Sequence, residues 1–557
     1  MNAANRKWTP LFVWIAVGAA ALAGMALVIY ATRYGPGVGG DATIYLTTAR
    51  NLLAGVGLGW VEADGSFRVL PYTPPGYPLA LSALGLLFPD LTAGARMLNV
   101  VVFGATVLGA GWFFYRQTGR AWLAGLLALA LAGSPVLLGV TVWAMSEPLF
   151  LLLGFAGLAL LLKYFERRQR AALVGSAALV GLAFLTRYMG VAFVAAGGLA
   201  LLAFAWWNAP REGRLHKRLA GPSWRGLGLY GLIALLPMGA WVVIDLTLTG
   251  AVSSRSGQDA ADWARRFAEF GPALERIYLF WLLPESVAAR LPGTARAALW
   301  LVPLAGLAAV GAWAARGGLK SPAQARAARL AALMAAFAVL YLAALAFVQV
   351  FTYPPVTLAG RMLSPVHLAV VVGLFALGSL VLERIAEEPA RLEARLERLR
   401  RLGVMVIIYA AALGLAGSYA LRGFLVAREY HRTGIGYTAP AWQTSDVLAA
   451  ARALPPEVPL ISNDVTALMY LADRPAYTLQ EIFQQRPQKT FTVYGQGEDE
   501  SQRVFREEGG ALVLFYDTLR EDFGMYGDRV DERLAVLTQG LVVYFQGEDG
   551  AIYFYPR

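Results

Sequence analysis

The sequence predicts a polytopic α-helical membrane protein that ends in a small soluble α/β domain. Of its 557 residues, 57% are hydrophobic and 15% are charged, and the mean hydropathy is +0.52. A soluble chain of this length would carry about a quarter charged residues. The apolar residues fall in blocks of about 20, the length that a helix needs to cross a hydrocarbon core of about 30 Å. Basic clusters lie in alternate connections between these blocks, which is the pattern of a multi-pass protein.

The first block, residues 11–30, follows Arg6 and Lys7. It is too long for a signal peptide and lacks a convincing small-residue cleavage site, so we expect an uncleaved anchor. About eleven transmembrane helices follow from counting it with ten further blocks. Those blocks lie near residues 97–115, 121–142, 145–163, 171–187, 190–208, 226–248, 297–315, 328–350, 362–382 and 403–421.

The basic clusters also predict the topology. With the N-terminus in the cytoplasm, all five clusters between the blocks are cytoplasmic, as the positive-inside rule requires. The loop 31–96, the loop 250–296 and the C-terminal tail then lie outside, and we expect the protein in the inner or plasma membrane. The net charge of +11 does not indicate a nucleic-acid partner, because residues 422–557 carry more acidic than basic side chains.

From about residue 422 the pattern becomes that of a soluble α/β module, which sets the predicted domains at 1–421 and 422–557. Strands are expected at 458–462 and 511–516. A hairpin is expected between 541–545 and 551–555, because a glycine-containing turn separates two alternating runs. The chain has 0 cysteines, so disulfides and thiolate metal sites are excluded.

The first outer loop carries two part-apolar stretches that are too short or too polar to span a membrane. They lie at residues 41–53 and 76–88, and both are expected as helices at the membrane interface. Between them, residues 72–78 read YTPPGYP, a rigid and aromatic segment. We expect it to position the loop or a lipid through Tyr72, Pro74, Pro75 and Tyr77.

Asp41 opens the first of these helices, after two glycines and with Tyr45 one turn along the same face. Two interpretations compete. An aspartate before a helix can be an N-cap, because its carboxylate accepts hydrogen bonds from free backbone N–H groups. The same carboxylate in an outer loop can also be a catalytic base.

Four more charged residues lie at the outer ends of predicted spans: Glu147, Arg187, Asp245 and Arg361. Each alone fits a side chain that reaches from the bilayer to water. Together they place acids and arginines at one level beside the first loop, which indicates a functional site. No cofactor is required by the sequence, and the three histidines lack metal-ligand spacing. A divalent metal shared by acidic residues stays open.

Five short motifs follow one another along the chain: GGD at 39–41, YTPPGYP at 72–78, SEPL at 146–149, LTR at 185–187 and RMLSP at 361–365. By their order and by the side of the membrane on which they are expected, they resemble the GT-C glycosyltransferases over roughly residues 10–385. The branch most similar is that of protein O-mannosyltransferases and aminoarabinose transferases, in its bacterial phospholipid-carrier-dependent members.

The resemblance implies an inverting glycosyltransferase of the cell envelope. A sugar would pass from a polyprenyl phosphate such as undecaprenyl phosphate to a hydroxyl of a glycan, lipid or protein, on the outer side of the membrane. It implies Asp41 as general base, with Glu147, Tyr45 and Asp245 lining an acidic or acceptor pocket. Arg187 and Arg361 would bind the donor phosphate. The resemblance therefore implies the role of each of these residues, and the matching motifs give its position in this sequence.

Two positions depart from the family. Thr73 stands where aminoarabinose transferases resemble one another in having a lysine, and Glu147 stands where their second acid is usually an aspartate. The acceptor therefore cannot be carried over.

Two other functions stay open. A transporter or flippase of a lipid-linked glycan would need broken helices and charges near the bilayer midplane, whereas these charges gather toward one face. In the other alternative the acidic tail is an interaction module and the membrane part its scaffold.

Overall fold

We describe the protein from a computed structural model, which covers most of the chain. The described residues are 3–70, 73–207, 222–249, 256–257, 260–299, 319, 321–353, 358–387, 394–479, 498–518, 534–535 and 538–556.

The membrane part is helical over most of its described residues. They are α1 (Ala3–Ala31), α2 (Gly40–Leu53), α3 (Gly76–Gly85), α4 (Leu91–Thr118), α5 (Ala121–Ala132), α6 (Pro135–Thr141), α7 (Glu147–Arg167), α8 (Arg170–Thr186), η1 (Tyr188–Gly190), α9 (Val191–Trp207), α11 (Pro222–Thr249), α12 (Ala260–Leu282), α13 (Glu285–Ala288), α15 (Pro322–Phe351), η2 (Gly360–Leu363), α16 (Ser364–Glu387) and α17 (Ala394–Thr433).

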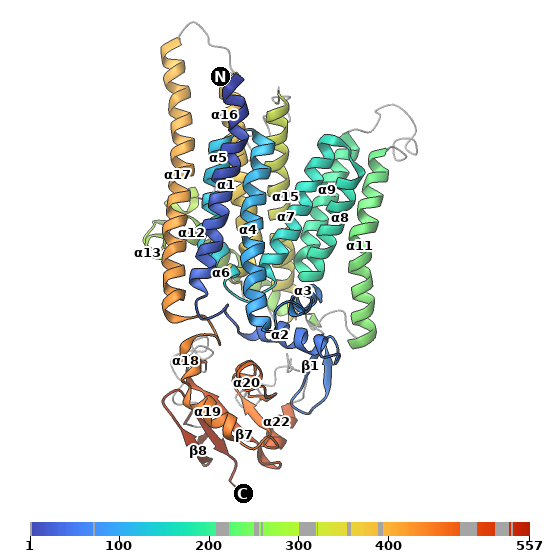
Figure 1. The fold of residues 1–557 in the computed structure, drawn as a ribbon, viewed down its shortest axis with the longest axis vertical. Helices are drawn as coiled ribbons and strands as arrows, with labels where there is room; N and C mark the ends of the chain where they lie inside the picture. The colour runs from blue at the N-terminus through green and yellow to red at the C-terminus, as the bar shows by residue number, and fades with distance from the viewer. Residues whose placement is uncertain are drawn as a thin grey trace.

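The long helices run side by side as a bundle, and α2 and α3 lie across one end of it (Figure 1). We call this end of the bundle the site end. The N-terminus lies at the opposite end, and the C-terminal strands lie beyond α2. Neighbours in sequence pack as antiparallel pairs, such as α7 with α8 and α15 with α16. Between α7 and α8 the connection is only residues 168–169, which forces them to lie antiparallel.

Eight described helices are long and apolar enough to cross a membrane. The pair α5 and α6, bent by 49° at its break, makes a ninth candidate, and α8 is a shorter apolar helix of 17 residues. The break follows from the sequence, because Ser134 caps α6 and Pro135 starts it. The fold class is therefore confirmed as polytopic and helical. The predicted span 297–315 lies mostly outside the described residues, so the count of eleven stays a prediction.

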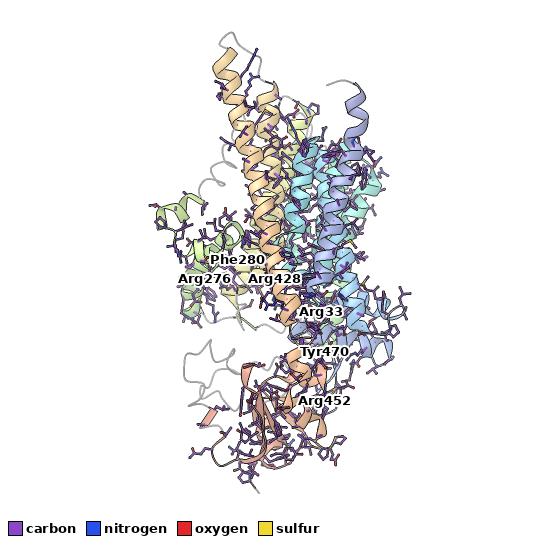
Figure 2. All side chains as sticks on the ribbon, turned by 60° about the vertical axis from the view of Figure 1, so that its left-hand side comes forward. Arg33, Arg276, Phe280, Arg428, Arg452 and Tyr470 are labelled. Atoms are coloured by element: carbon purple, nitrogen blue, oxygen red, sulfur yellow. The ribbon has the colours of Figure 1, made fainter. Side chains whose placement is uncertain are left out.

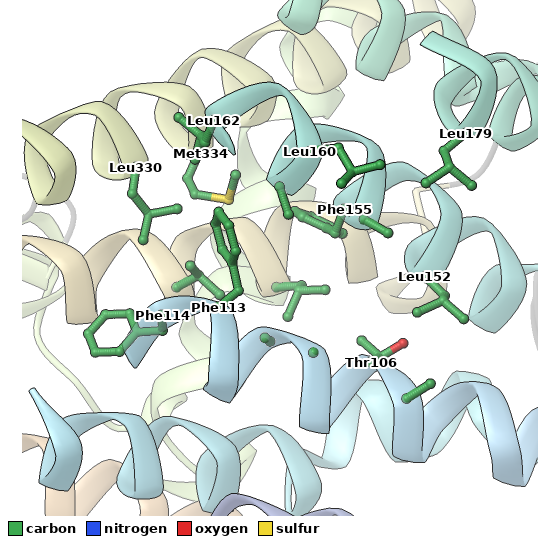
Figure 3. Close-up of a pocket in the computed structure, with 17 residues that line it drawn as sticks. Thr106, Phe113, Phe114, Leu152, Phe155, Leu160, Leu162, Leu179, Leu330 and Met334 are labelled. Atoms are coloured by element: carbon green, nitrogen blue, oxygen red, sulfur yellow. The ribbon is translucent and has the colours of Figure 1, made fainter. Parts of the chain in front are cut away.

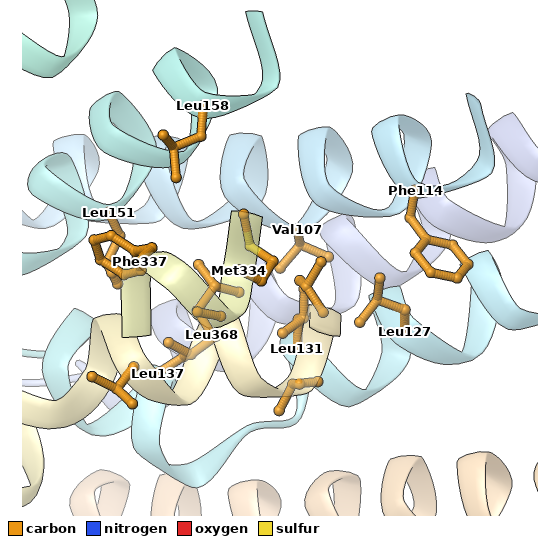
Figure 4. Close-up of a cluster of buried hydrophobic side chains, with 14 of the residues drawn as sticks. Val107, Phe114, Leu127, Leu131, Leu137, Leu151, Leu158, Met334, Phe337 and Leu368 are labelled. Carbon is orange, nitrogen blue, oxygen red and sulfur yellow. The ribbon is translucent and has the colours of Figure 1, made fainter. Parts of the chain in front are cut away.

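The bundle is held by one large apolar cluster that spans almost all of its helices. It includes the fully buried side chains of Val107, Leu127, Leu131 and Phe337 (Figure 4). The outer faces of the same helices carry exposed leucines and valines. That distribution is expected where the surrounding solvent is hydrocarbon, because no polar outer face is then needed.

The first loop folds as predicted into two short helices. The expected helices 41–53 and 76–88 correspond to α2 and α3. Between them β1 (Gly59–Val61) and β2 (Phe67–Val69) form an antiparallel hairpin. In the second loop α12 and α13 are present, and β3 (Ser256–Gly257) pairs with β4 (Thr352–Tyr353).

The C-terminal part contains a mixed five-stranded sheet with the order β6-β5-β7-β9-β8. Strands β5, β6 and β7 are parallel, whereas β8 and β9 form an antiparallel hairpin. The predicted strands and hairpin correspond to β5, β7, β8 and β9 with ends shifted by one or two residues. The bounds are β5 (Leu460–Ser462), β6 (Tyr477–Thr478), β7 (Ala511–Phe515), β8 (Val542–Gln546) and β9 (Gly550–Phe554), with helices α18 (Pro440–Gln443), α19 (Asp446–Ala453), α20 (Val465–Leu471) and α22 (Glu498–Arg506). The division at residue 421 stays a prediction, since α17 continues to Thr433.

Candidate functional site at one end of the bundle

Asp41 lies in the first turn of α2, and its carboxylate faces Arg361. The Oδ2 atom of Asp41 is 3.3 Å from Nη2 of Arg361, and 45% of each side chain is exposed. The N-cap of α2 is Gly39, in an extended conformation, so the N-cap interpretation of Asp41 is wrong. The carboxylate of Asp41 instead lies in the first turn of α2. A negative charge there is favourable, because the N-terminus of a helix carries a partial positive charge.

A second acid–arginine pair lies beside the first and is buried. Oε1 of Glu147 is 2.9 Å from Nη1 of Arg187, and the exposed fractions are 3% for Glu147 and 20% for Arg187. The contact is an ion pair, and its geometry falls short of a hydrogen bond. Arg187 also donates to Oγ of Ser146 at 3.1 Å. Among the described residues no donor reaches Oε2 of Glu147, which is an unusual state for a buried carboxylate oxygen.

Two buried tyrosines of the first loop, Tyr45 and Tyr77, lie beside these pairs. Tyr45 lies 3.4 Å from Ser146 through its hydroxyl, and its ring packs edge-on against Tyr77 at 5.2 Å. Burial, and then the negative charge of Asp41, raises the pKa of Tyr45, so that its phenol stays neutral. Burial raises the pKa of Tyr77 as well. Within the described part of the chain the Tyr77 hydroxyl has no hydrogen-bond partner.

Tyr341 belongs to this site and was not identified from the sequence. It lies fully within α15, and its hydroxyl donates to the backbone oxygen of Met362 at 2.9 Å. Met362 follows Arg361 in the short η2 turn, so Tyr341 holds the turn that carries this arginine. The signal in the sequence is a lone tyrosine inside an otherwise apolar span, which is too common to be diagnostic.

The Pro-Pro-Gly segment packs against the end of α8. Pro74 and Pro75 are buried, and a Cβ atom on Gly76 would lie 2.5 Å from the backbone oxygen of Leu185. Only glycine fits at this approach. Leu185 is two residues before Arg187, so the segment packs directly against the backbone that leads to this arginine. Tyr72 lies outside the described residues.

Asp245 joins the site through a tyrosine. It accepts a hydrogen bond of 3.3 Å from Tyr188, the residue after Arg187, and Tyr188 in turn accepts one from Trp241. Of the predicted site residues, the structure therefore brings Asp41, Tyr45, Glu147, Arg187 and Arg361 together. Asp245 packs on the neighbouring turn.

No group of three or more histidine or acidic side chains in the described residues could hold a metal ion. Asp41 and Glu147, the two acids of the site, each have an arginine partner.

An apolar cavity of about 380 Å³ opens between α4, α7, α8, α15 and α16 (Figure 3). Its lining includes Phe113, Phe155, Leu330 and Met334, and Thr106 is the sole side chain with a polar atom among its lining residues. Helices α7 and α16 begin at the site end, next to Glu147 and Arg361, and continue along the cavity. A space of this chemistry suits hydrocarbon.

Comparison with solved structures identifies the fold. The chain is similar to ArnT from Cupriavidus metallidurans bound to undecaprenyl phosphate, with a TM-score of 0.53 and 17% identity over 98% of each chain. The chain has the GT-C fold. It is also similar to the archaeal oligosaccharyltransferase AglB from Archaeoglobus fulgidus, in complex with an inhibitory peptide and a dolichol-phosphate. That likeness has a TM-score of 0.54 and 14% identity, over 99% of this chain and 75% of AglB.

No family model and no curated protein matches the sequence. The GT-C fold and the long apolar helices together make the chain a multi-pass membrane protein. The fold does not by itself give an activity, which has to be argued from the site.

Proposed function

We propose that the protein is an inverting glycosyltransferase that moves a sugar from a polyprenyl phosphate to a hydroxyl acceptor. The proposal depends on the exposed Asp41–Arg361 pair, which lies beside the buried Glu147–Arg187 ion pair. An exposed carboxylate next to an exposed guanidinium offers the two groups that this reaction needs. One accepts a proton and the other binds a phosphate.

The donor would enter from the lipid, with its phosphate at Arg361. A guanidinium can hold a phosphate through paired hydrogen bonds. The phosphate then replaces the Asp41 carboxylate as the partner of Arg361. Arg187 was predicted for the same task, and it retains donors for it, because a guanidinium has five N–H groups and its Nη1 serves Glu147 and Ser146.

The fold supports a lipid-linked donor, since ArnT and AglB are structures with undecaprenyl phosphate and dolichol-phosphate. The apolar cavity offers space for hydrocarbon among the helices that begin at the site. We expect the site end outside the membrane and the N-terminus in the cytoplasm, from the distribution of basic residues.

In the reaction, the oxygen of the acceptor hydroxyl attacks the anomeric carbon of the sugar from the side opposite the phosphate. The bond from that carbon to the phosphate oxygen breaks, and polyprenyl phosphate leaves with its electron pair. The carboxylate of Asp41 takes the hydroxyl proton. Arg361 stabilises the charge that develops on the departing phosphate.

The test uses purified protein in proteoliposomes with radiolabelled polyprenyl-phosphate sugars and a panel of hydroxyl acceptors. Asp41→Asn keeps the shape of the side chain and removes its basicity. We expect transfer to fall by about 10²–10⁴-fold, with carrier binding retained. Asp473→Asn is the matched control, because Asp473 is an exposed aspartate in the C-terminal part.

Full activity of Asp41→Asn would exclude the base assignment. The alternative of a flippase predicts that labelled glycolipid crosses the bilayer while no sugar is released from its carrier.

A further inference from the structure

The segment before Asp41, residues 36–38, is joined by isolated β-bridges to two other segments of the chain. Gly37 forms a parallel bridge with Trp143, with hydrogen bonds from the Gly37 amide to the Val142 oxygen and from the Ala144 amide to the Gly37 oxygen, both at 2.8 Å. Trp143 lies four residues before Glu147, and Gly37 four before Asp41. The two acids of the site therefore follow two segments that are hydrogen-bonded directly to each other.

The other side of this segment is covered by the C-terminal part of the chain. Val38 forms a parallel bridge with Gly436, and its oxygen accepts a hydrogen bond of 2.8 Å from the Tyr437 amide. Thr438 donates to the Pro36 oxygen, also at 2.8 Å. Residues 434–438, which we call the positioning strand, are thus joined by a single β-bridge to residues 36–38, which are joined by another to residues 142–144.

Glycines make this arrangement possible. Gly436 has a φ of +55°, and a Cβ atom on it would lie 2.1 Å from the Val38 oxygen. A side chain there would separate the segments, because a backbone oxygen cannot move aside as a flexible side chain can. A Cβ on Gly37 would lie 2.5 Å from Ile435 and 2.6 Å from Trp143, so it would displace both of these side chains.

The positioning strand is anchored in the C-terminal sheet. The hydroxyl of Tyr437 donates to Oδ1 of Asp464 at 2.6 Å, and Asp464 caps α20. Tyr470 at the end of α20 hydrogen-bonds Thr92 of α4 at 3.2 Å and packs under Arg50 of α2. Figure 2 shows Tyr470 at the junction of the bundle with the C-terminal part.

One apolar cluster runs across this junction without interruption. It contains Ala42, Tyr45 and Leu46 of α2 together with Val447, Val513 and Ile552 of the C-terminal part. Buried apolar contact of this kind fixes relative position, because separating the two surfaces would expose both of them to water.

We propose that the C-terminal part is a positioning element for the two acids of the site, and that the positioning strand transmits its effect. The strand holds residues 36–38, which set where α2 begins and so where Asp41 stands. Through Gly37 it also holds residues 142–144, which set where Glu147 begins α7. This inference rests on the proposed function for its effect on sugar transfer, whereas its structural half is independent of any activity.

The main test is Gly436→Val in the full chain, in proteoliposomes. Its matched control is Gly540→Val, since Gly540 also has a positive φ of +79° but has nothing within 4 Å of the place that a Cβ atom would take. We expect the turnover rate of Gly436→Val to fall by about 10²-fold, the effect of displacing a catalytic group by about 1 Å. The apparent KM for the carrier should change little, because Arg361 lies on η2, outside the bridged segments.

A second readout does not depend on activity. Amide hydrogen exchange is measured over peptides that contain Gly37 and Ala144, on the far side of the bridge from the substitution. We expect exchange there to become about tenfold faster in Gly436→Val, as a local hydrogen bond is lost. Unchanged exchange at Gly37 and Ala144, with faster exchange at Tyr437, would overturn the proposal.

Thr438→Val keeps the test decisive if Gly436→Val does not fold. It is nearly isosteric and removes only the hydrogen bonds of the hydroxyl, including the one to Pro36. Its control is Thr444→Val, whose hydroxyl bonds within its own turn. We expect faster exchange at Gly37 in Thr438→Val alone, and equal exchange in both variants would contradict the proposal. If the wild-type protein transfers no sugar, the proposed function fails, and the exchange result still decides whether the segments are coupled.

Discussion

The two acid–arginine pairs have the same chemistry and opposite environments. Both side chains of the Asp41–Arg361 pair are 45% exposed and their contact is 3.3 Å, whereas Glu147 of the other pair is 3% exposed and its contact is 2.9 Å. An exposed pair contributes about 0.2–1 kcal/mol. Removing one partner of a buried pair costs about 3–5 kcal/mol, because a charge is left without compensation. The exposed pair can therefore separate for a substrate, and the buried pair holds the structure around it.

The largest expected effect is on stability, from Arg187→Met. This change keeps an unbranched side-chain stem, removes the guanidinium and leaves Glu147 buried without its partner. We expect the free energy of unfolding to fall by about 3–5 kcal/mol, measured by denaturation in detergent micelles.

The double variant Glu147→Gln/Arg187→Met is its control. It removes both charges, so most of the lost stability should return. If the single variant is as stable as the wild type, the pair does not have the structural role assigned to it.

Arg361→Ala should act on binding and spare stability. A hydrogen bond to a charged group contributes about 1.5–3 kcal/mol, so the affinity for polyprenyl phosphate should fall by about 10–100-fold. The unfolding free energy should change by less than about 1 kcal/mol, since the pair is exposed. Arg361→Lys should be intermediate, because it keeps the charge but not the paired donors. An affinity equal to that of the wild type in Arg361→Ala would remove this residue from the phosphate site.

Gly76→Ala probes the buried pair from outside. The added Cβ would lie 2.5 Å from the Leu185 oxygen and displace the backbone before Arg187. Overpacking of this kind costs about 1–3 kcal/mol, and we expect a lower melting temperature together with slower sugar transfer. Gly139→Ala is the control, because nothing lies within 4 Å of the added atom there. Equal behaviour of the two variants would mean that the Pro-Pro-Gly segment does not support Arg187.

Gly109→Leu tests the apolar cavity and should have the smallest effect. Gly109 lines the cavity and has free space for a side chain. If the cavity holds part of the carrier, the apparent KM should rise for long carriers and stay unchanged for a short analogue. Gly198→Leu on α9 is the control, with space for a side chain but no place in the cavity lining. If the substitution changed the KM equally for long and short carriers, the cavity would not hold the carrier during the reaction.

Much of the fold follows from the sequence because its signals are local. Hydrocarbon-length blocks give the spans, and the glycines before Asp41 and the prolines before Gly76 give the starts of α2 and α3. The sequence also predicts that the charged residues share one end, because the alternation of basic loops predicts on which side each span ends. The resemblance to GT-C glycosyltransferases is confirmed at the level of the fold.

The pairing of the acids with the arginines could not be predicted. Arg361 meets Asp41 across 320 positions of sequence, and their contact depends on where the η2 turn lies relative to α2. Tyr341 could not be predicted for the same reason, because its role depends on its hydrogen bond to the Met362 oxygen in the η2 turn. The strand formed by residues 434–438 carries no periodic pattern, and its bridge to Val38 arises from the docking of two distant segments.

A structure with polyprenyl phosphate bound tests the contrast between the two pairs most directly. We predict that the phosphate lies against Arg361, that the Asp41–Arg361 contact opens beyond hydrogen-bond distance, and that Glu147 and Arg187 stay paired. A phosphate bound while Asp41 and Arg361 remain in contact, or one that separates Glu147 from Arg187, would contradict this account.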